Sequence, residues 1–340
     1  MFDFKKERYN CNGTLQTNQL YVEYGLECPC DCSFCHNKVR AKNRQNVCLS
    51  KVDDTVLRYC SDCKRVIFGG GEPLLHFEKI MALVQKIRQD ERSTEKAYSD
   101  ELPVDAVKCN IVTNGDRQLY HKYLYSKVDN TKKTIVGILL GEYDTEDVET
   151  PEVCERCHLF DKIIISRHHY DDYRNQVIFG ATNELLTTSD LRWMCNGQKE
   201  KITLYCVCQK GGIDSREEIF GYLYWAVKLG YKNILFSDLD LHNTPSDIYA
   251  KRNISQDVFR SVIDMLIMWN AQRIPHEVYN SSGYDTTTLQ IPKGLFLDHD
   301  VLNDEPLNIS FKQYMDVPAG NKRFCNYTNE RIVCSDGTIG

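Results

Sequence analysis

Long apolar runs are missing from this 340-residue sequence: no stretch of about 18 apolar residues occurs, which excludes a membrane-spanning helix. The opening residues, MFDFKKERYN, hold no apolar segment of the kind found in secretory signal peptides, so we expect a cytoplasmic protein. Positive charge is not in excess either, because 42 Lys and Arg stand against 48 Asp and Glu, a net charge of -6. That balance gives no general attraction for nucleic acid or an anionic membrane, and we expect neither as a partner.

Cysteine, by contrast, is abundant, with 16 residues. The cytosol keeps thiols reduced, so we do not expect a disulfide framework, and clustered cysteines in that compartment indicate a metal site. The densest cluster is LECPCDCSFCHN (26–37), in which Cys28, Cys32 and Cys35 have the spacing C-x3-C-x2-C. Cys30 lies between them as a surplus thiol.

The rest of the sequence alternates short apolar runs with amphipathic helical patterns, and no internal repeat or low-complexity segment interrupts this order. Such alternation predicts an α/β fold built from parallel βαβ units. Beyond about residue 245 the alternation weakens, which indicates an appended region. Strands are predicted at 20–25, 65–73, 107–115, 161–169, 201–212 and 233–241, with 134–143 as a further strand.

Capping signals mark the ends of two predicted helices. Ser50, with Asp53 three residues later, forms a capping box and predicts a helix start. Ser215 and Glu218 form a second capping box, and Gly230 predicts the end of that helix. The predicted helices cover 50–60, 74–89, 215–230 and 255–273.

Three motifs follow three successive predicted strands. The cysteine motif, with the aromatic Phe34 before its last cysteine, follows the first strand, GGGEP (69–73) follows the second, and TNG (113–115) follows the third. In this order the motifs resemble those of the radical S-adenosylmethionine (SAM) superfamily. The resemblance covers about residues 18–241. It implies an N-terminal lead-in (1–17), a partial (β/α)6 radical SAM barrel (18–244) and a C-terminal extension (245–340) that covers the barrel and contributes to the substrate site.

The three motif cysteines suit a [4Fe–4S] cluster. Such a cluster is normally held by four thiolates, so Cys28, Cys32 and Cys35 leave one iron open. The resemblance implies that this iron chelates the amino and carboxylate groups of SAM, and that the reduced cluster cleaves SAM to a 5′-deoxyadenosyl radical. It also implies an electron donor such as flavodoxin or ferredoxin. We expect Cys30 to point away from the cluster, because its use would break the family spacing.

The resemblance also implies a set of SAM-binding residues. The glycine turn allows positive φ and close approach of a ligand, and in the family its carbonyls accept hydrogen bonds from the SAM ammonium. The alternative is a plain strand-to-helix turn with Pro73 at the first helical position. For the TNG motif a plain turn is the stronger interpretation than direct SAM contact, since Asn-Gly is a common turn signal. The residues concerned are Gly69, Gly70, Gly71, Glu72, Asn114 and Ser166.

The later strands resemble those of the molybdenum-cofactor GTP cyclase and its relatives, in which a serine at the position of Ser166 contacts SAM. Arg167 is then a candidate for holding a carboxylate or phosphate bidentately. His168 is a candidate at the same rim, although a solvated position is the plainer interpretation. Lys210 lies near a glycine-bearing turn of that family. Asp238 ends the sixth strand, either as a carboxylate for a substrate hydroxyl or ammonium or as part of a solvated loop.

The C-terminal region departs from that enzyme. The GTP cyclase holds a second cluster with three cysteines there, whereas RFCNYTNERIVCSDGTIG supplies only Cys325 and Cys334. Two thiolates do not form such a site, so either another cysteine joins them or the auxiliary cluster is lost, and we favour loss. GTP is therefore not carried over as the substrate.

Two C-x-x-C pairs have zinc-type spacing. One precedes the second strand and the other precedes the fourth, so both are expected at the amino-terminal face of the barrel, opposite the active site. They form either one structural zinc site with four thiolate ligands or two pairs of unliganded loop thiols. The four residues are Cys60, Cys63, Cys154 and Cys157.

The sequence predicts a radical SAM enzyme that abstracts hydrogen from a small molecule of the sugar, nucleoside or amino-acid type. About 18 residues precede the first strand, too few for a peptide-recognition domain, so peptide modification is the second hypothesis. A non-catalytic iron–sulfur or zinc protein is the hypothesis from another class. Iron content and the cleavage of SAM after reduction would distinguish this non-catalytic hypothesis from the two enzyme hypotheses.

Overall fold

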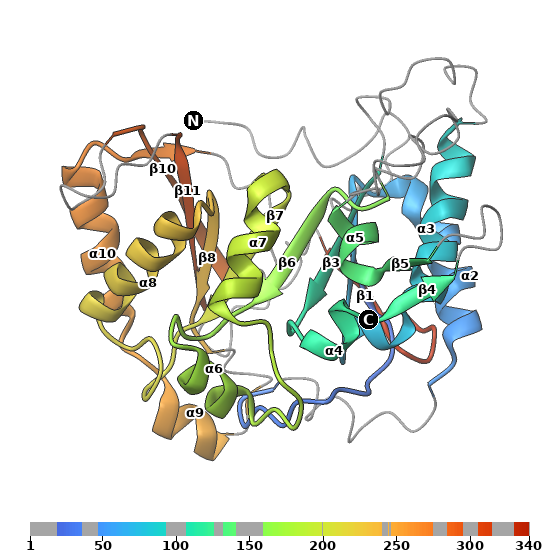
Figure 1. Ribbon diagram of the computed structural model, residues 1–340, viewed down its shortest axis with the longest axis horizontal. Helices are drawn as coiled ribbons and strands as arrows, with labels where there is room; N and C mark the ends of the chain where they lie inside the picture. Colours follow the sequence, from blue (N-terminus) through green and yellow to red (C-terminus); the bar gives the residue numbers. More distant parts are fainter. Residues whose placement is uncertain are drawn as a thin grey trace, which may run out of the picture.

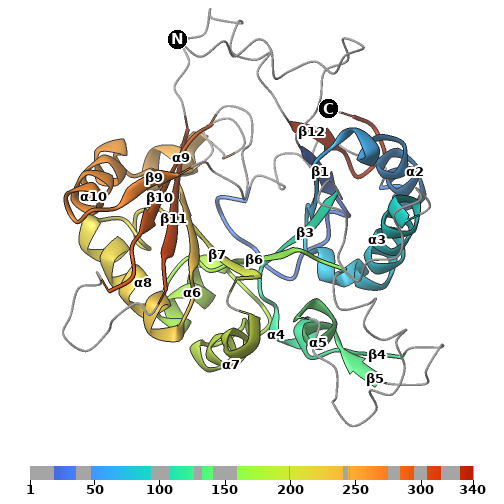
Figure 2. The ribbon, with the colours of Figure 1, turned by 90° about the horizontal axis from the view of Figure 1, so that it is seen from above.

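The computed structural model describes residues 19–35, 47–92, 107–125, 132–140, 159–198, 200–239, 244, 246–274, 284–294, 305–314 and 330–339. Within them a curled ten-stranded sheet has the order β12-β1-β2-β3-β6-β7-β8-β11-β10-β9 (Figures 1 and 2). The six strands predicted for the barrel all form and pair in parallel, which confirms the predicted α/β class. They are β1 (Gln19–Glu23), β2 (Arg65–Gly69), β3 (Lys108–Thr113), β6 (Lys162–Ser166), β7 (Ile202–Val207) and β8 (Asn233–Ser237).

Strands from the region after residue 245 lengthen this sheet at both edges. β11 (Leu307–Tyr314) pairs in parallel with β8, and β10 (Tyr284–Ile291) and β9 (Gln272–Ile274) follow it in antiparallel pairs. β12 (Glu330–Val333) pairs in parallel with β1 at the other edge. The described part of this region is therefore built into the barrel sheet itself.

Helices line the convex side of the curled sheet (Figure 2). In α8 the predicted capping signals agree with the structure: Ser215 caps the helix by accepting from the Glu218 amide, and Gly230 ends it with a left-handed backbone. Ser255 caps α10 by accepting from the Asp257 amide. The helical segments are α2 (Leu49–Tyr59), η1 (Cys60–Asp62), η2 (Pro73–His76), α3 (Phe77–Arg92), α4 (Arg117–Tyr120), α5 (Ile135–Leu140), α6 (Asp172–Phe179), α7 (Thr188–Gln198), α8 (Arg216–Leu229), α9 (Ser246–Arg252) and α10 (Gln256–Met268). No helix among the described residues is long and apolar enough to cross a membrane.

Two local predictions are wrong. The segment predicted as a strand at 134–143 instead forms the helix α5, after a short hairpin of β4 (Tyr123–Tyr125) and β5 (Lys132–Thr134). Its buried residues Ile135, Val136, Leu139 and Leu140 have helical spacing, so one helix face buries an apolar run that also reads as a strand. Helix α2 begins one residue before Ser50, with Cys48 at the N-cap and no side-chain cap.

The two faces of the barrel sheet differ in polarity, because side chains alternate between faces along each strand. On the convex side, residues such as Val66, Phe68 and Ile111 belong to the apolar core that also includes helix residues. The alternate positions on the concave side include Lys108 and Asn110, which line a cavity. The helices thus take the apolar face, and the concave face carries the polar side chains that a ligand can use.

Candidate cluster site at the carboxyl edge of the sheet

The three sequence motifs converge at the carboxyl ends of β1, β2 and β3. The cysteine loop runs from Tyr24 to Cys35 directly after β1, and appears in Figure 1 as the blue trace below α6. The GGGEP turn ends β2, and the TNG turn ends β3. Parallel strands bring successive carboxyl ends to one edge, which is where barrel folds place their ligands.

Main-chain hydrogen bonds join the GGGEP turn to the start of the cysteine loop. The amide of Gly71 donates to the carbonyl of Gly25 at 3.0 Å, and the amide of Glu72 donates to the carbonyl of Glu27 at 2.7 Å. A Cβ at Gly71 would lie 2.1 Å from the Glu27 carbonyl oxygen, so the approach requires glycine. Gly70 adopts a φ of +109°, which also favours glycine, and its amide donates to the Tyr21 hydroxyl at 3.1 Å. Gly69 ends β2 with the same Tyr21 ring beside it.

Glu72 links the second and third motifs. Its buried carboxylate accepts from the amide of Leu74 at 3.0 Å, the hydroxyl of Thr113 at 2.8 Å and the amide of Asn114 at 2.8 Å. Burial raises the pKa of Glu72 to about 8, although the three donors oppose that shift. The carboxylate thus ties the ends of two neighbouring strands together and also caps the short helix after Pro73.

Asn114 then joins the third motif to the cysteine loop. Its side-chain nitrogen lies 3.2 Å from the sulfur of Cys30 and 3.5 Å from that of Cys28, while its oxygen accepts from the amide of Asp116. A hydrogen bond with Cys30 lowers the pKa of Cys28 to about 6, and the same contact raises the pKa of Cys30. Cys30 therefore lies beside Cys28, and its predicted orientation away from a bound cluster stays a prediction.

The far side of the cysteine loop is held by the segment that follows α6. The amide of Asp31 donates to the carbonyl of Phe179 at 3.0 Å, and the Thr182 hydroxyl donates to the carbonyl of Pro29 at 3.0 Å. Gly180 ends α6 with a left-handed backbone and lies against Asp31. The turn after β2 and the end of α6, far apart in sequence, thus hold the loop from two sides.

The donor set fits a cluster in which each thiolate binds a different iron. Cys28 is exposed, Cys35 is half-buried, and Cys32 is buried beside Phe34 and Phe179. Within the described residues, no three Cys, His, Asp or Glu side chains gather closely enough to hold a single metal ion. Three thiols spread along one loop, with apolar side chains on one side, suit the larger [4Fe–4S] group, which needs sulfur ligands and shielding from water.

The structure gives Arg167 a different role from the predicted one. The guanidinium is 2% exposed and donates to the carbonyls of His169, Leu186 and Tyr170 at 2.7, 2.8 and 3.1 Å. It also pairs with Asp172. These bonds direct its donors to the protein itself, so Arg167 holds the loop after β6 and is not presented to a substrate.

His168 is buried next to the cysteine loop. Its ring stacks on Phe179 with a centroid distance of 4.4 Å and contacts the edge of Phe34 at 5.2 Å. Burial, with a smaller effect from the neighbouring Arg167, lowers its pKa to about 3, so the imidazole is neutral at neutral pH. Its Nδ1 accepts from the amide of Val207 at 3.1 Å, which places the ring proton on Nε2.

The remaining predicted residues occupy three different environments. Ser166 ends β6, half-buried, on the concave side. Lys210 is exposed, and its amide donates to the carbonyl of Arg252. Asp238 is buried directly after β8, and its amide donates to the carbonyl of Lys312. These positions bring Ser166 and Asp238 to the carboxyl edge near the motifs.

Sequence reasoning missed two buried charged residues at this edge. Glu23 ends β1 and Lys312 lies near the end of β11, and both are almost completely buried. Charged residues at alternate positions of otherwise apolar strands were the available signal, since such positions face the interior of a barrel.

The zinc prediction is only partly within the described residues. Cys60 and Cys63 lie buried just before β2, and their thiols donate to the carbonyls of Leu57 and Tyr59 at 3.6 and 3.3 Å. Cys154 and Cys157 lie outside the described residues, so the shared site stays a prediction. Cys334 is buried directly after β12, and Cys325 also lies outside the described residues.

Comparisons with known proteins agree with this geometry. Residues 12–99 match the 4Fe-4S single cluster domain family. The structure is similar to that of SuiB from Streptococcus suis, alone (TM-score 0.51, 12% identity) and bound to S-adenosylmethionine (0.52, 13%), over 96% of this chain and 60% of that chain. Coproporphyrinogen III oxidase (HemN) from Escherichia coli, described as a radical SAM enzyme, matches with TM-score 0.41 and 10% identity over 76% of this chain and 54% of that one.

No curated protein matches the sequence. The chain spans 54–60% of the length of these structural neighbours. The family match confirms the predicted 4Fe–4S domain, and the shared fold confirms the predicted partial barrel.

Proposed function

We propose that this chain, a member of the radical SAM superfamily by its cluster domain and its fold, is an enzyme that abstracts hydrogen from a small polar molecule. Cys28, Cys32 and Cys35 would hold the [4Fe–4S] cluster. When bound, the cluster and SAM supply a 5′-deoxyadenosyl radical, and the protein supplies orientation and exclusion of water. The observation that carries the proposal is the hydrogen-bonded path from Glu72 through Asn114 to the cysteine loop.

Along this path each motif holds a neighbouring segment in position. Glu72 fixes the ends of β2 and β3 relative to each other, so the two turns meet the cysteine loop as one unit. Asn114 donates toward the sulfurs of Cys28 and Cys30, and such donors stabilise thiolate charge at a cluster. Gly71 lets the cysteine loop approach the turn closely, because a Cβ there would meet the Glu27 carbonyl.

The concave face supports a small polar substrate. Ser166, Glu23 and Lys312 lie near the carboxyl ends of their strands, and Asp238 follows the end of β8. A hydroxyl, two carboxylates and an ammonium group suit a substrate with hydroxyl and amino functions better than an apolar one. His168 is neutral and encloses one side of the cysteine loop with Phe34 and Phe179, so it would keep water from the cluster rather than carry a proton.

Peptide modification remains the second candidate. SuiB has also been crystallised bound to the precursor peptide SuiA. A peptide is longer than a single sugar, nucleoside or amino acid and would need more of the concave face. The two candidates differ in what triggers SAM cleavage: sugars, nucleosides and amino acids for the first, and peptides for the second.

Anaerobic reconstitution tests the proposal. We expect about four irons per chain, a brown protein, and 5′-deoxyadenosine after reduction in the presence of SAM. Replacing Cys28, Cys32 and Cys35 together by Ala should abolish both the iron and the SAM cleavage. Cys30→Ala is the matched control, because it removes a neighbouring thiol outside the motif. Iron retained in the triple variant, or lost in the control, would overturn the ligand assignment.

A further inference from the structure

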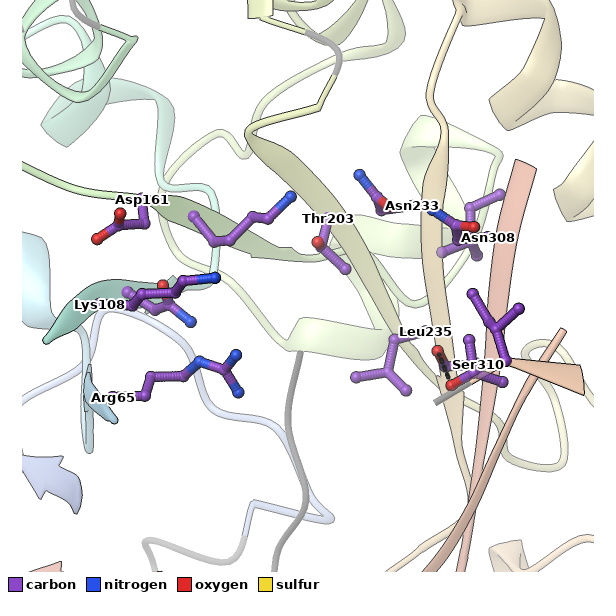
Figure 3. Close-up of a pocket in the computed structure, with 13 residues that line it drawn as sticks. Arg65, Lys108, Asp161, Thr203, Asn233, Leu235, Asn308 and Ser310 are labelled. Carbon is purple, nitrogen blue, oxygen red and sulfur yellow. Dashed lines mark hydrogen bonds between the residues drawn. The ribbon is translucent and has the colours of Figure 1, made fainter. Parts of the chain in front are cut away.

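A second polar site lies at the opposite end of the concave face. A cavity of about 290 Å³ opens among the amino-terminal halves of the barrel strands (Figure 3). Arg65, Lys108 and Lys162 are the first residues of β2, β3 and β6, whereas the cysteine loop follows the carboxyl ends. With about 3.3 Å per residue, the four steps along β2 separate the two ends by about 13 Å. The cavity is therefore distinct from the cluster site.

One wall of this cavity is cationic. Arg65 and Lys108 are directly paired in register on neighbouring strands, and Lys162 is paired with Asn110 one strand further. In Figure 3 the Arg65 and Lys108 side chains extend into the same space. Like charges directly opposite each other on adjacent strands are unfavourable, so this arrangement favours a negative charge between them.

The carboxylate in the lining does not supply that charge. Asp161 accepts from the Arg88 guanidinium at 2.7 Å and from the Cys109 amide at 2.7 Å, so its charge is balanced by a buried arginine outside the cavity. The Lys162 ammonium donates to the carbonyl of Glu200. The described lining thus has an excess of positive charge.

Two buried side chains in the lining have hydrogen-bonding atoms without partners. Asn110 is 1% exposed, and neither its side-chain oxygen nor its nitrogen has a partner among the described residues. Thr203, also 1% exposed, has an unpartnered hydroxyl, and lies on the next wall of the cavity (Figure 3). Each such atom costs about 1–3 kcal/mol of stability when buried, and a ligand that pairs with these atoms would recover that free energy.

The opposite wall is neutral and already ordered. Asn308 donates to the side-chain oxygen of Asn233 at 3.1 Å, and the hydroxyls of Thr288 and Ser310 lie 2.9 Å apart. Amide and hydroxyl groups complement the hydroxyl-bearing body of a polar metabolite, whereas the cationic wall complements an oxyanion.

We propose that this cavity is a binding site for a phosphate or carboxylate group of a small polar molecule, with Arg65 and Lys108 as its charged ligands and Asn110 and Thr203 as its hydrogen-bond partners. The anion is either the far end of the radical enzyme's own substrate or a separate small ligand. The first source rests on the proposed function, and the second does not.

The test uses inorganic phosphate as the probe on the whole chain, with the cluster reconstituted anaerobically, and follows binding by calorimetry and phosphorus NMR. We expect one saturable site. Lys108→Gln and Arg65→Gln should each weaken phosphate binding about tenfold or more, since each removes a charge-assisted hydrogen bond. Lys64→Gln is the matched control, because Lys64 is exposed, adjacent in sequence and outside the cavity lining. Absence of saturable binding, or equal binding in all variants, would overturn the proposal.

Asn110→Leu separates a ligand site from a structural defect. The substitution removes the unpartnered polar atoms, so the phosphate-free variant should unfold at a higher temperature than the wild type while binding phosphate more weakly. Lower stability together with unchanged phosphate affinity would assign Asn110 a structural role and contradict the proposal.

Competition identifies the source of the anion. If sugar phosphates or nucleotides displace phosphate and also raise 5′-deoxyadenosine release, whereas their dephosphorylated forms do not raise it, the cavity holds the substrate's anionic end. Displacement without a rise in release assigns a separate anion. Phosphate binding does not require SAM cleavage, so failure of the anion site and failure of the proposed radical chemistry are distinguished directly.

Discussion

The carboxyl and amino edges of the concave face differ in how their buried polar side chains are hydrogen-bonded. At the carboxyl edge two buried charged side chains are engaged within the protein: Glu72 accepts from three donors, and Arg167 gives its hydrogen bonds to carbonyls and to Asp172. At the amino edge Asn110 and Thr203 are unsatisfied among the described residues, and Arg65 faces Lys108. A binding site for a large cofactor needs internal order, whereas a site for a small anion can keep polar atoms such as those of Asn110 and Thr203 unpartnered until the anion binds. The difference predicts opposite responses to mutation.

The largest effect is expected at Arg167. Arg167→Met should lower the free energy of unfolding by about 3 kcal/mol or more, because three buried carbonyls lose their donor. Lys108→Met at the other end should change it by about 0.5 kcal/mol or less, since the side chain is exposed. Urea denaturation of both variants measures this contrast. A similar loss of unfolding free energy in the two variants would contradict the proposed difference between the two edges.

An intermediate effect is expected at Gly71. Gly71→Ala places a methyl group 2.1 Å from the Glu27 carbonyl oxygen, so the cysteine loop must shift, at a cost of about 1–3 kcal/mol. We expect a lower melting temperature and less iron per folded chain after reconstitution. Gly221→Ala is the control, because its Cβ would meet only an ordinary contact with Tyr170 at 3.4 Å and lies within a helix. Full iron content in Gly71→Ala would show that the close approach is not needed.

The third effect is a pH dependence of stability, which we expect from His168 near the carboxyl edge. Burial lowers the pKa of His168 from 6.5 to about 3, so between these values the unfolded chain binds a proton that the folded chain does not. His168 therefore contributes stability that is present above about pH 6.5 and is lost progressively as the pH falls toward 3.

His168→Asn removes this titration while keeping an acceptor for the Val207 amide. The difference in free energy of unfolding between wild type and variant should shrink as the pH is lowered from 7 to about 4, within that window. Parallel stability curves would show that His168 titrates normally in the folded protein. Lys108→Met, at the amino edge, should give a curve parallel to that of the wild type.

The sequence predicted the elements that depend on local pattern. Apolar runs indicated all six barrel strands, and the capping signals at Ser215 and Gly230 agree with the structure because a cap satisfies main-chain groups within a few residues of itself. The same reasoning failed at 134–143, where Ile and Val in a short apolar run favour a strand and only packing selects the helix α5. Arg167 was misassigned because its partners come from the loop after β6, the first residue of α6 and the segment before α7.

By itself, the sequence predicted a [4Fe–4S] site, because three cysteines with this spacing lie on one short loop whatever the rest of the fold. It also determined the order of parallel strands through the alternation of apolar and helical segments. Only the tertiary structure decided that Asn114 reaches Cys28 and Cys30, and that Arg65, Lys108 and Asn110 face one cavity with Thr203. Those contacts depend on strand register and on the curl of the sheet, which bring together side chains from β2, β3 and β7 that no local pattern connects.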